Sequence, residues 1–117
     1  MNKNIEYNGW TNWETWNLKL WIDNDENLYH EINSLVHANI FSSIIKKGGF
    51  DNVDYYKVST RLHEYFETLT YEKIIGFGFF RDVSIQALND VNFMEIAKHI
   101  VNDLREDEER IEKISSK

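Results

Sequence analysis

FMEIAKHIVNDL, residues 93–104, has the most regular apolar pattern in the chain. Its apolar side chains recur at steps of three and four residues, which is the period of one helix face. The residues of this ladder are Phe93, Ile96, Ala97, Ile100, Val101 and Leu104. Asn92 stands directly before the ladder as a candidate N-cap, with Glu95 three residues later. The segment therefore predicts an amphipathic helix with a capped start.

The segment NWETWNLKLWI, from about Asn12 to Ile22, predicts a second helix. Thr11 and Glu14 have the spacing of a capping box, in which each side chain bonds the other residue's backbone N–H. Because each tryptophan can bury a large area, this helix is expected to supply part of the core. We expect it to pack on the C-terminal helix through five residues: Trp16, Trp21, Phe93, Ile96 and Ile100. For Trp10 and Trp13, at the start of the helix, the pattern leaves core and surface open.

The middle of the chain predicts two further helices and an unusual connection. One helix spans about 28–45 and ends at Lys46–Gly49, where cations and glycines suit a helix C-terminus. Another runs from Tyr55 to about Thr70. Residues 74–80, IIGFGFF, are compatible with a short strand, a buried loop or a distorted helix end. We interpret them as a buried connection, followed by a short helix from about Asp82 to Asn89.

Length and composition agree with a single helical domain. The chain has 117 residues, no proline and only five glycines, a composition that permits long helices. We therefore predict an all-α fold, a compact bundle of four or five helices that forms one domain over residues 1–117. Within it, residues 1–10 are expected to form a polar arm, and residues 105–117 an acidic helix end that is partly frayed.

Several classes of protein are excluded or disfavoured by simple counts. The absence of cysteine excludes disulfides and thiolate metal ligands. No apolar run approaches the length of a transmembrane helix, and the N-terminus lacks the apolar region of a secretory signal. The formal net charge of −7 disfavours direct binding to a nucleic-acid backbone. We therefore expect a cytoplasmic protein that contacts neither membrane nor nucleic acid directly.

The polar residues contain no strong catalytic or metal-binding pattern. Asp23, Asp25 and Glu26 lack the glycine and the final acid of an EF-hand loop, and helix capping explains them better. The histidines have single acidic neighbours four residues away, such as Glu67 beside His63, and no HExxH motif is present. The serines lack the sequence context of a nucleophile. We therefore expect no catalytic residue, no metal site and no cofactor.

Two surfaces are candidates for binding a partner. Between Asp103 and Glu112, six acidic residues stand beside two arginines, a local net charge of −4. A solvated helix end is the simpler explanation of this run, and an acidic surface for a basic partner is the functional one. Rings at the start of the first helix form the other candidate. The residues predicted to touch a partner are Trp10, Trp13, Glu106, Asp107, Glu108 and Glu109.

Two segments carry a family resemblance. The first is YNGWTNWETWN, residues 7–17, which continues as LWIDNDE at 20–26; the second is LNDVNFMEIA, residues 88–97. Together they resemble a family of small uncharacterised proteins of phages, plasmids and other mobile elements, with which no established catalytic chemistry is associated. The resemblance implies an accessory protein of a phage or mobile element that acts in the host cytoplasm.

These observations together favour a non-enzymatic protein-binding factor. We expect it to inhibit a host defence complex, in the manner of an anti-CRISPR protein, by steric or charge-mimicking occlusion. The expected partner is a host protein or complex, including nucleic-acid-binding effectors. Two alternatives stay open: a structural or regulatory homodimer that associates through the aromatic N-terminal helix, and a small enzyme whose carboxylate and histidine groups lie far apart in sequence.

Overall fold

Five α-helices and one short 3₁₀-helix make up the described part of the chain. The structure is a computed structural model and describes residues 6–45 and 49–115. In chain order the elements are α1 (Trp13–Asn24), α2 (Glu26–Ile45), η1 (Gly49–Asn52), α3 (Tyr55–Lys73), α4 (Gly78–Asp90) and α5 (Phe93–Ser115). No described residue belongs to a strand, so the predicted all-α fold is confirmed.

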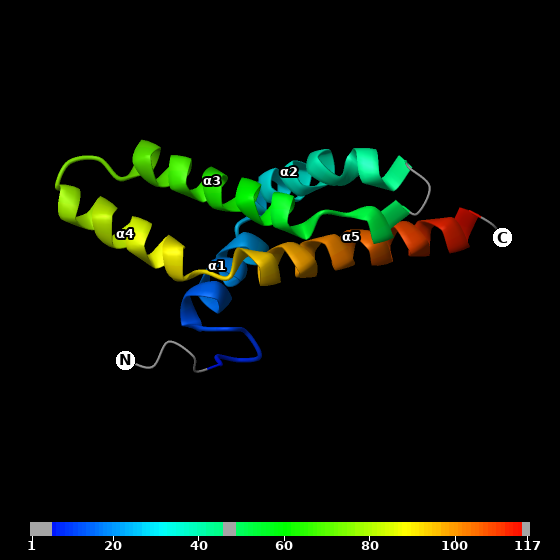
Figure 1. Cartoon of the computed structure of the whole chain (residues 1–117), viewed down its shortest axis with the longest axis horizontal. Coiled ribbons are helices and arrows are strands. Elements are labelled where there is room, and N and C mark those ends of the chain that lie inside the picture. The colour runs from blue at the N-terminus through cyan, green and yellow to red at the C-terminus, as the bar shows by residue number, and fades with distance from the viewer. Residues whose placement is uncertain (1–5, 46–48, 116–117) are drawn as a thin grey trace.

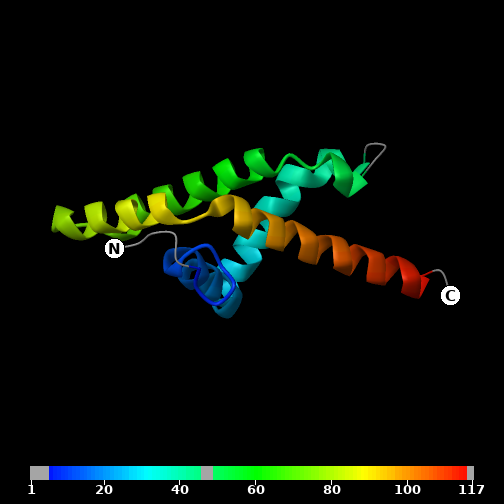
Figure 2. The same cartoon turned by 60° about the horizontal axis from the view of Figure 1, so that its bottom comes forward.

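The helices form an elongated body of 56 × 31 × 24 Å. Figure 1 shows α3 and α4 side by side as an antiparallel hairpin whose turn lies at one end of the long axis. α5 begins at the open end of this hairpin, packs along the first part of α3 and ends at the opposite end of the molecule. In Figure 2, α2 crosses behind α5 and connects α1 with η1.

The core lies where α1, α2, α3 and α5 meet. Val53, in the short link between η1 and α3, covers one edge of this core. Its buried apolar residues are Ile22, Ile32, Val36, Ile40, Val53, Val58, Leu62, Phe66, Phe93, Ile96, Ala97, Ile100 and Val101. The ladder predicted on α5 is thus confirmed as a core face. The prediction that Trp21 packs in this core is wrong, because Trp21 is 59% exposed. Trp16 is half-buried.

Two aspartates stand at helix boundaries, where their side chains cap the helix that follows. Asp25 ends α1, where its backbone N–H donates to the Trp21 carbonyl, and its carboxylate accepts from the Leu28 N–H in the first turn of α2. Asp54 caps α3 by accepting from the Lys57 N–H. Residues 46–48 of the predicted helix stop lie outside the described residues. None of the described helices is long and apolar enough to cross a membrane.

The connection between α3 and α4 differs from the prediction. The predicted buried connection at 74–80 is wrong: α3 continues to Lys73, Gly76 reverses the chain at a φ of 100°, and α4 begins at Gly78 rather than near Asp82. Because this turn lies at the end of the hairpin, no other described helix covers it. We call its exposed apolar residues the hairpin tip: Tyr71, Ile75, Phe77, Phe79, Phe80 and Val83.

Candidate protein-binding surfaces

The N-termini of α1 and α5 are each capped by an asparagine. The Asn12 Oδ1 accepts from the backbone N–H of Thr15 at 2.9 Å and from its hydroxyl at 2.6 Å. The Asn92 Oδ1 accepts from the Glu95 N–H at 3.0 Å, as the sequence predicts. Each asparagine satisfies an N–H that the first turn of a helix leaves unpaired.

Residues at the start of α1 also bond to residues 90–95, where α4 ends and α5 begins, in an arrangement that we call the junction. The Asn92 N–H donates to the Thr15 hydroxyl at 2.8 Å, and the Asn92 side-chain amide donates to the Thr11 hydroxyl at 2.9 Å. The Thr11 N–H donates to the Glu95 carboxylate at 2.9 Å. The Asn12 side-chain amide donates to the Asp90 carbonyl at 2.7 Å. Four hydrogen bonds thus join segments that are 77 to 84 residues apart.

The junction corrects the predicted capping box. Thr11 is not the N-cap of α1, and the carboxylate that accepts from its N–H belongs to Glu95 of α5 rather than to Glu14. Thr15 is fully buried, and its hydroxyl is satisfied because it donates to the Asn12 Oδ1 and accepts from the Asn92 N–H. Residues 11–15 and 90–95 therefore meet in space, and their polar groups bond to one another there.

The position of Thr15 decides which side of α1 faces the core. The residues of α1 that are buried are Thr15, Lys19 and Ile22, spaced by four and three. The Lys19 ammonium lies 2.6 and 2.7 Å from the two carboxylate oxygens of Asp23, so the charge on this side is paired. The side of α1 away from Thr15 consequently points outward, and it carries apolar residues. We call three of its residues the tryptophan face: Trp13, Leu20 and Trp21, which are 49%, 42% and 59% exposed.

The segment before α1 holds a further tryptophan in a fixed place. Asn8 and Gly9 have φ values of 48° and 85°, as the two central residues of a type I′ turn require, and Tyr7 and Trp10 exchange backbone hydrogen bonds of 2.8 and 2.7 Å across them. The turn brings the half-buried Trp10 ring to 4.2 Å from the His99 ring on α5, measured between centroids. Trp10 therefore contributes less open surface than Trp13.

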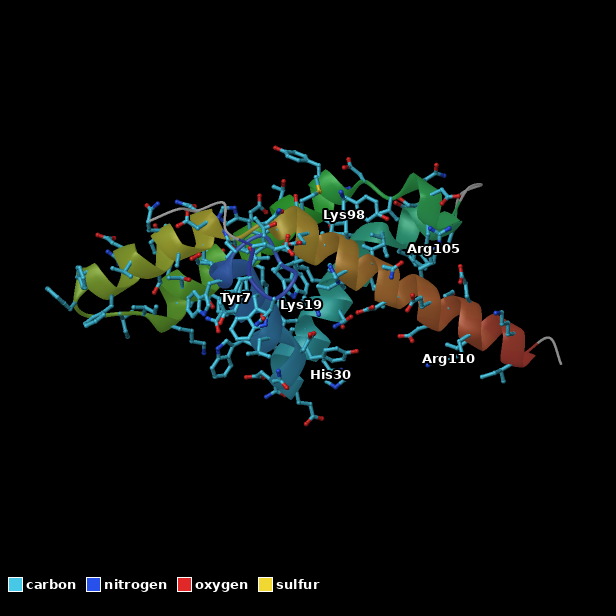
Figure 3. The ribbon with its side chains drawn as sticks, turned by 90° about the horizontal axis from the view of Figure 1, so that it is seen from below. Tyr7, Lys19, His30, Lys98, Arg105 and Arg110 are labelled. Atoms are coloured by element: carbon cyan, nitrogen blue, oxygen red, sulfur yellow. The ribbon has the colours of Figure 1, made fainter. Side chains whose placement is uncertain are left out.

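The acidic run occupies the exposed end of α5. Glu106, Asp107, Glu108 and Glu109 are all exposed. Two of these acids pair within the helix, Asp107 with Arg110 at 2.9 Å and Glu109 with Arg105 at 3.6 Å. Figure 3 shows Arg105 turned toward η1, where it also pairs with Asp51 at 3.1 Å. Arg110 lies farther along α5, on the part that extends beyond η1. Part of the local negative charge is thus balanced by arginine.

A polar pocket with several titratable residues lies between α2 and α3. It has a volume of about 580 Å³, and its lining includes Glu31, Arg61, Tyr65 and Glu72. The Tyr65 hydroxyl donates to the Glu31 carboxylate. Burial, that hydrogen bond and the negative charges of Glu31 and Glu72 raise the pKa of Tyr65 from 10.0 to about 12. The phenol therefore stays protonated at neutral pH, where it can donate a hydrogen bond but cannot act as a base.

The histidines are distributed over three helices: His30 and His37 on α2, His63 on α3 and His99 on α5. His63 stacks on Phe93 at 4.9 Å between ring centroids and is 3.8 Å from the Glu67 carboxylate. Among the described residues, no group of three His, Asp or Glu side chains could hold a metal ion. Asp23 and Asp25, weighed as cation ligands, instead pair with Lys19 and cap α2.

The comparison with known families gives one match. A model described as a family of unknown function (DUF7249) matches residues 3–44, that is, 42 of the 117 residues. Over α1 and most of α2 the chain is similar to that family, and the matched segment includes the tryptophan face and the α1 half of the junction. No curated protein and no solved structure matches the chain.

Proposed function

We propose that the protein is a non-enzymatic binding factor that recognises another protein through the tryptophan face. The observation that supports this proposal is the exposure of Trp13, Leu20 and Trp21 on the side of α1 away from the buried Thr15. Tryptophan is enriched among the residues that dominate interface energies, because it offers a large apolar surface together with a donor N–H. Covering such rings with a partner removes much apolar area from water.

The acidic end of α5 supports the proposal through its charge. We assign it a steering role, because a negative surface accelerates the approach of a basic partner more than it strengthens the final complex. Glu106 and Glu108 lie outside the ion pairs formed by Asp107 and Glu109, so their charge is the more available. Trp10, half-buried beside His99, has a secondary role in this scheme.

The resemblance to phage and mobile-element proteins supplies the biological setting of the proposal. In that setting the partner is a host protein in the cytoplasm, and a defence complex such as a CRISPR effector is a suitable target. The basic groove with which such a complex holds nucleic acid would accept an acidic helix, so the protein would inhibit it by occlusion.

Affinity capture with matched variants tests the proposal. The immobilised protein is incubated with host lysate at about 50 mM and about 500 mM salt, since charge steering weakens as the screening length shortens. We expect one stoichiometric partner that the double variant Trp13→Ala/Trp21→Ala fails to retain. Tyr56→Ala is the matched control, because Tyr56 is an aromatic residue that is 71% exposed on another helix, α3. It should retain the partner.

A second pair of variants tests the acidic end of α5. Glu106→Lys/Glu108→Lys should slow association at low salt and have little effect at high salt. Glu6→Lys/Glu67→Lys changes the net charge equally at two exposed positions outside α5 and should leave the association rate nearly unchanged. A partner retained equally by the tryptophan variant would refute the contact role, and the absence of any partner would refute the proposal as a whole.

A further inference from the structure

The hairpin tip is an apolar surface whose rings contact one another rather than the core. Phe77, Phe79 and Phe80 are 71%, 59% and 60% exposed, yet their ring centroids lie only 5.6 to 6.1 Å apart. The Arg81 guanidinium lies 5.6 Å from the centre of the Tyr71 ring. These contacts form one preorganised cluster at the end of the long axis, on the turn between α3 and α4 in Figure 1.

α4 has a second apolar side that the fold does not use. All residues of α4 are described and none is buried. Its half-buried side is formed by residues at helical spacing: Arg81, Ser84, Ile85 and Leu88. Phe79, Val83 and Ala87, spaced by four, lie on another side and are exposed. Helices with apolar residues on two sides are typical of elements that pack against two neighbours, and α4 has only one side covered.

The size of the hairpin tip matches what a stable interface needs. With fully exposed aromatic side chains at 150–250 Å² each, its six residues expose about 700 Å² in total. This exceeds the patch of about 300–600 Å² found on typical monomers and approaches the roughly 800 Å² that each partner contributes to a standard interface.

The charges around the hairpin tip favour a second copy as the partner. Two acids and two bases border it, Glu72 and Asp82 with Lys73 and Arg81, so the local net charge is zero in a chain of net charge −7. A two-fold arrangement can place each sign opposite the other. It also keeps the two acidic α5 ends far apart, because α5 ends at the opposite end of the molecule in Figures 1 and 2. An anionic membrane, which attracts basic segments, fits this neutral tip less well.

From the exposed cluster, its area and its balanced charge, we infer that a second copy of the chain packs on the hairpin tip. The α3–α4 hairpins of the two copies then form a four-helix arrangement, in which Phe79 and Val83 are covered by their counterparts. This surface is separate from the tryptophan face, so the inference does not depend on the proposed function.

Sedimentation velocity over a range of concentrations tests this inference on the full chain. We expect a dimer of about 28 kDa, twice the monomer mass of 14.0 kDa. Phe79→Ser/Val83→Ser should raise the dimer Kd about thirtyfold or more, because truncated interface anchors are costly. The matched control is Trp21→Ser, since Trp21 and Phe79 are equally exposed at 59%. It should leave the dimer Kd unchanged.

Charge exchange gives an independent readout of the same interface. Lys73→Glu/Arg81→Glu leaves four acids around the tip, and Glu72→Lys/Asp82→Lys leaves four bases. Each variant alone should be monomeric with a wild-type helical circular dichroism spectrum, and an equimolar mixture should form a heterodimer. Recovery of association in the mixture cannot come from a folding defect, because both chains must be folded to pair.

Three outcomes would overturn the inference. A chain that stays monomeric up to about 100 μM, far above the Kd of ordinary specific complexes, would exclude a dimer of functional strength. A dimer lost in Trp21→Ser but retained in the tip variant would place the interface on α1. A monomer that binds phosphatidylcholine vesicles through Phe79 would identify a lipid surface as the occupant instead.

Discussion

At the junction, the fully buried Thr15 both donates and accepts a hydrogen bond, whereas at the hairpin tip Phe77 leaves 71% of its surface in solvent. The two regions therefore reverse the usual distribution of polar and apolar residues. Polar side chains join α1 to α5 at the junction, where each is satisfied by a partner from a distant segment. Aromatic side chains gather at the tip, where the fold does not require them.

The two regions also differ in how their helices begin. α1 and α5 start at the junction with asparagine caps; the Asn12 amide also donates to the Asp90 carbonyl at the end of α4, and the Asn92 amide to the Thr11 hydroxyl just before α1. α4 starts at the tip with Phe77 in the N-cap position and no side-chain hydrogen bond there. Since a side-chain cap contributes about 1 kcal/mol, the start of α4 is less stable locally than that of α1. The difference separates a region that fixes the fold from one available for binding.

The largest expected effect comes from the core beside the junction. Ile96→Ala should lower the free energy of unfolding by about 2–5 kcal/mol, because Ile96 is fully buried. Trp21→Ala, which removes a larger but exposed side chain from α1, should cost about 0.5 kcal/mol. Urea titration followed by circular dichroism measures both. A cost for Trp21→Ala as large as that for Ile96→Ala would show that the tryptophan face is covered in the folded protein.

Next in size is the hydrogen bonding of the junction itself. Thr15→Val preserves the shape of the side chain but removes the hydroxyl that accepts from Asn92 and donates to Asn12, so it should cost about 1–3 kcal/mol. Thr60→Val is the matched control, because Thr60 is an exposed helical threonine whose hydroxyl donates to a local carbonyl. If the two variants unfold at the same urea concentration, the junction does not stabilise the fold.

These contrasts also explain what the sequence could predict. The α5 ladder was predictable because Phe93, Ile96 and Ile100 repeat with the helix period, and each is buried. The cap at Asn92 was predictable because it acts within one turn. The junction was not predictable, because a hydrogen bond from Thr11 to Glu95 spans 84 residues and therefore produces no recognisable spacing in the local sequence.

The exposure of Trp13 and Trp21 could not be predicted for the same reason, because it depends on the long-range hydrogen bonds of Thr15. Size and hydrophobicity alone favour Trp21 over Thr15 for the core, and the structure has the opposite order. The Thr15 hydroxyl is needed at the junction, and once it faces inward the helix period turns Trp13 and Trp21 outward. Similarly, the apolar run at 74–80 suggested burial, yet a turn at the end of a two-helix hairpin has no neighbour to bury it. Trp10, Trp13 and the acids of α5 remain predicted contact residues.

At the hairpin tip, stability should depend on protein concentration. If two copies associate there, the melting temperature should rise by about 3 °C for each tenfold increase in concentration above the dimer Kd. Phe79→Ser/Val83→Ser should melt at one temperature throughout, equal to that of dilute wild-type protein, because both residues are exposed in the monomer. Differential scanning calorimetry measures the trend. An identical trend in wild type and variant would locate any association elsewhere.

A smaller, pH-dependent effect is expected on α3, where Tyr65 donates to Glu31. The folded pKa of Tyr65, about 12, is above the unfolded value of 10.0, so its contribution to stability is complete below pH 10 and is lost as the pH rises through 12. Tyr65→Phe should therefore be about 1 kcal/mol less stable at pH 9, and this difference should shrink toward pH 12. Tyr56→Phe, at an exposed position, controls for general effects of alkali. A difference between wild type and Tyr65→Phe that stays constant from pH 9 to 12 would show that the Glu31 bond does not set this titration.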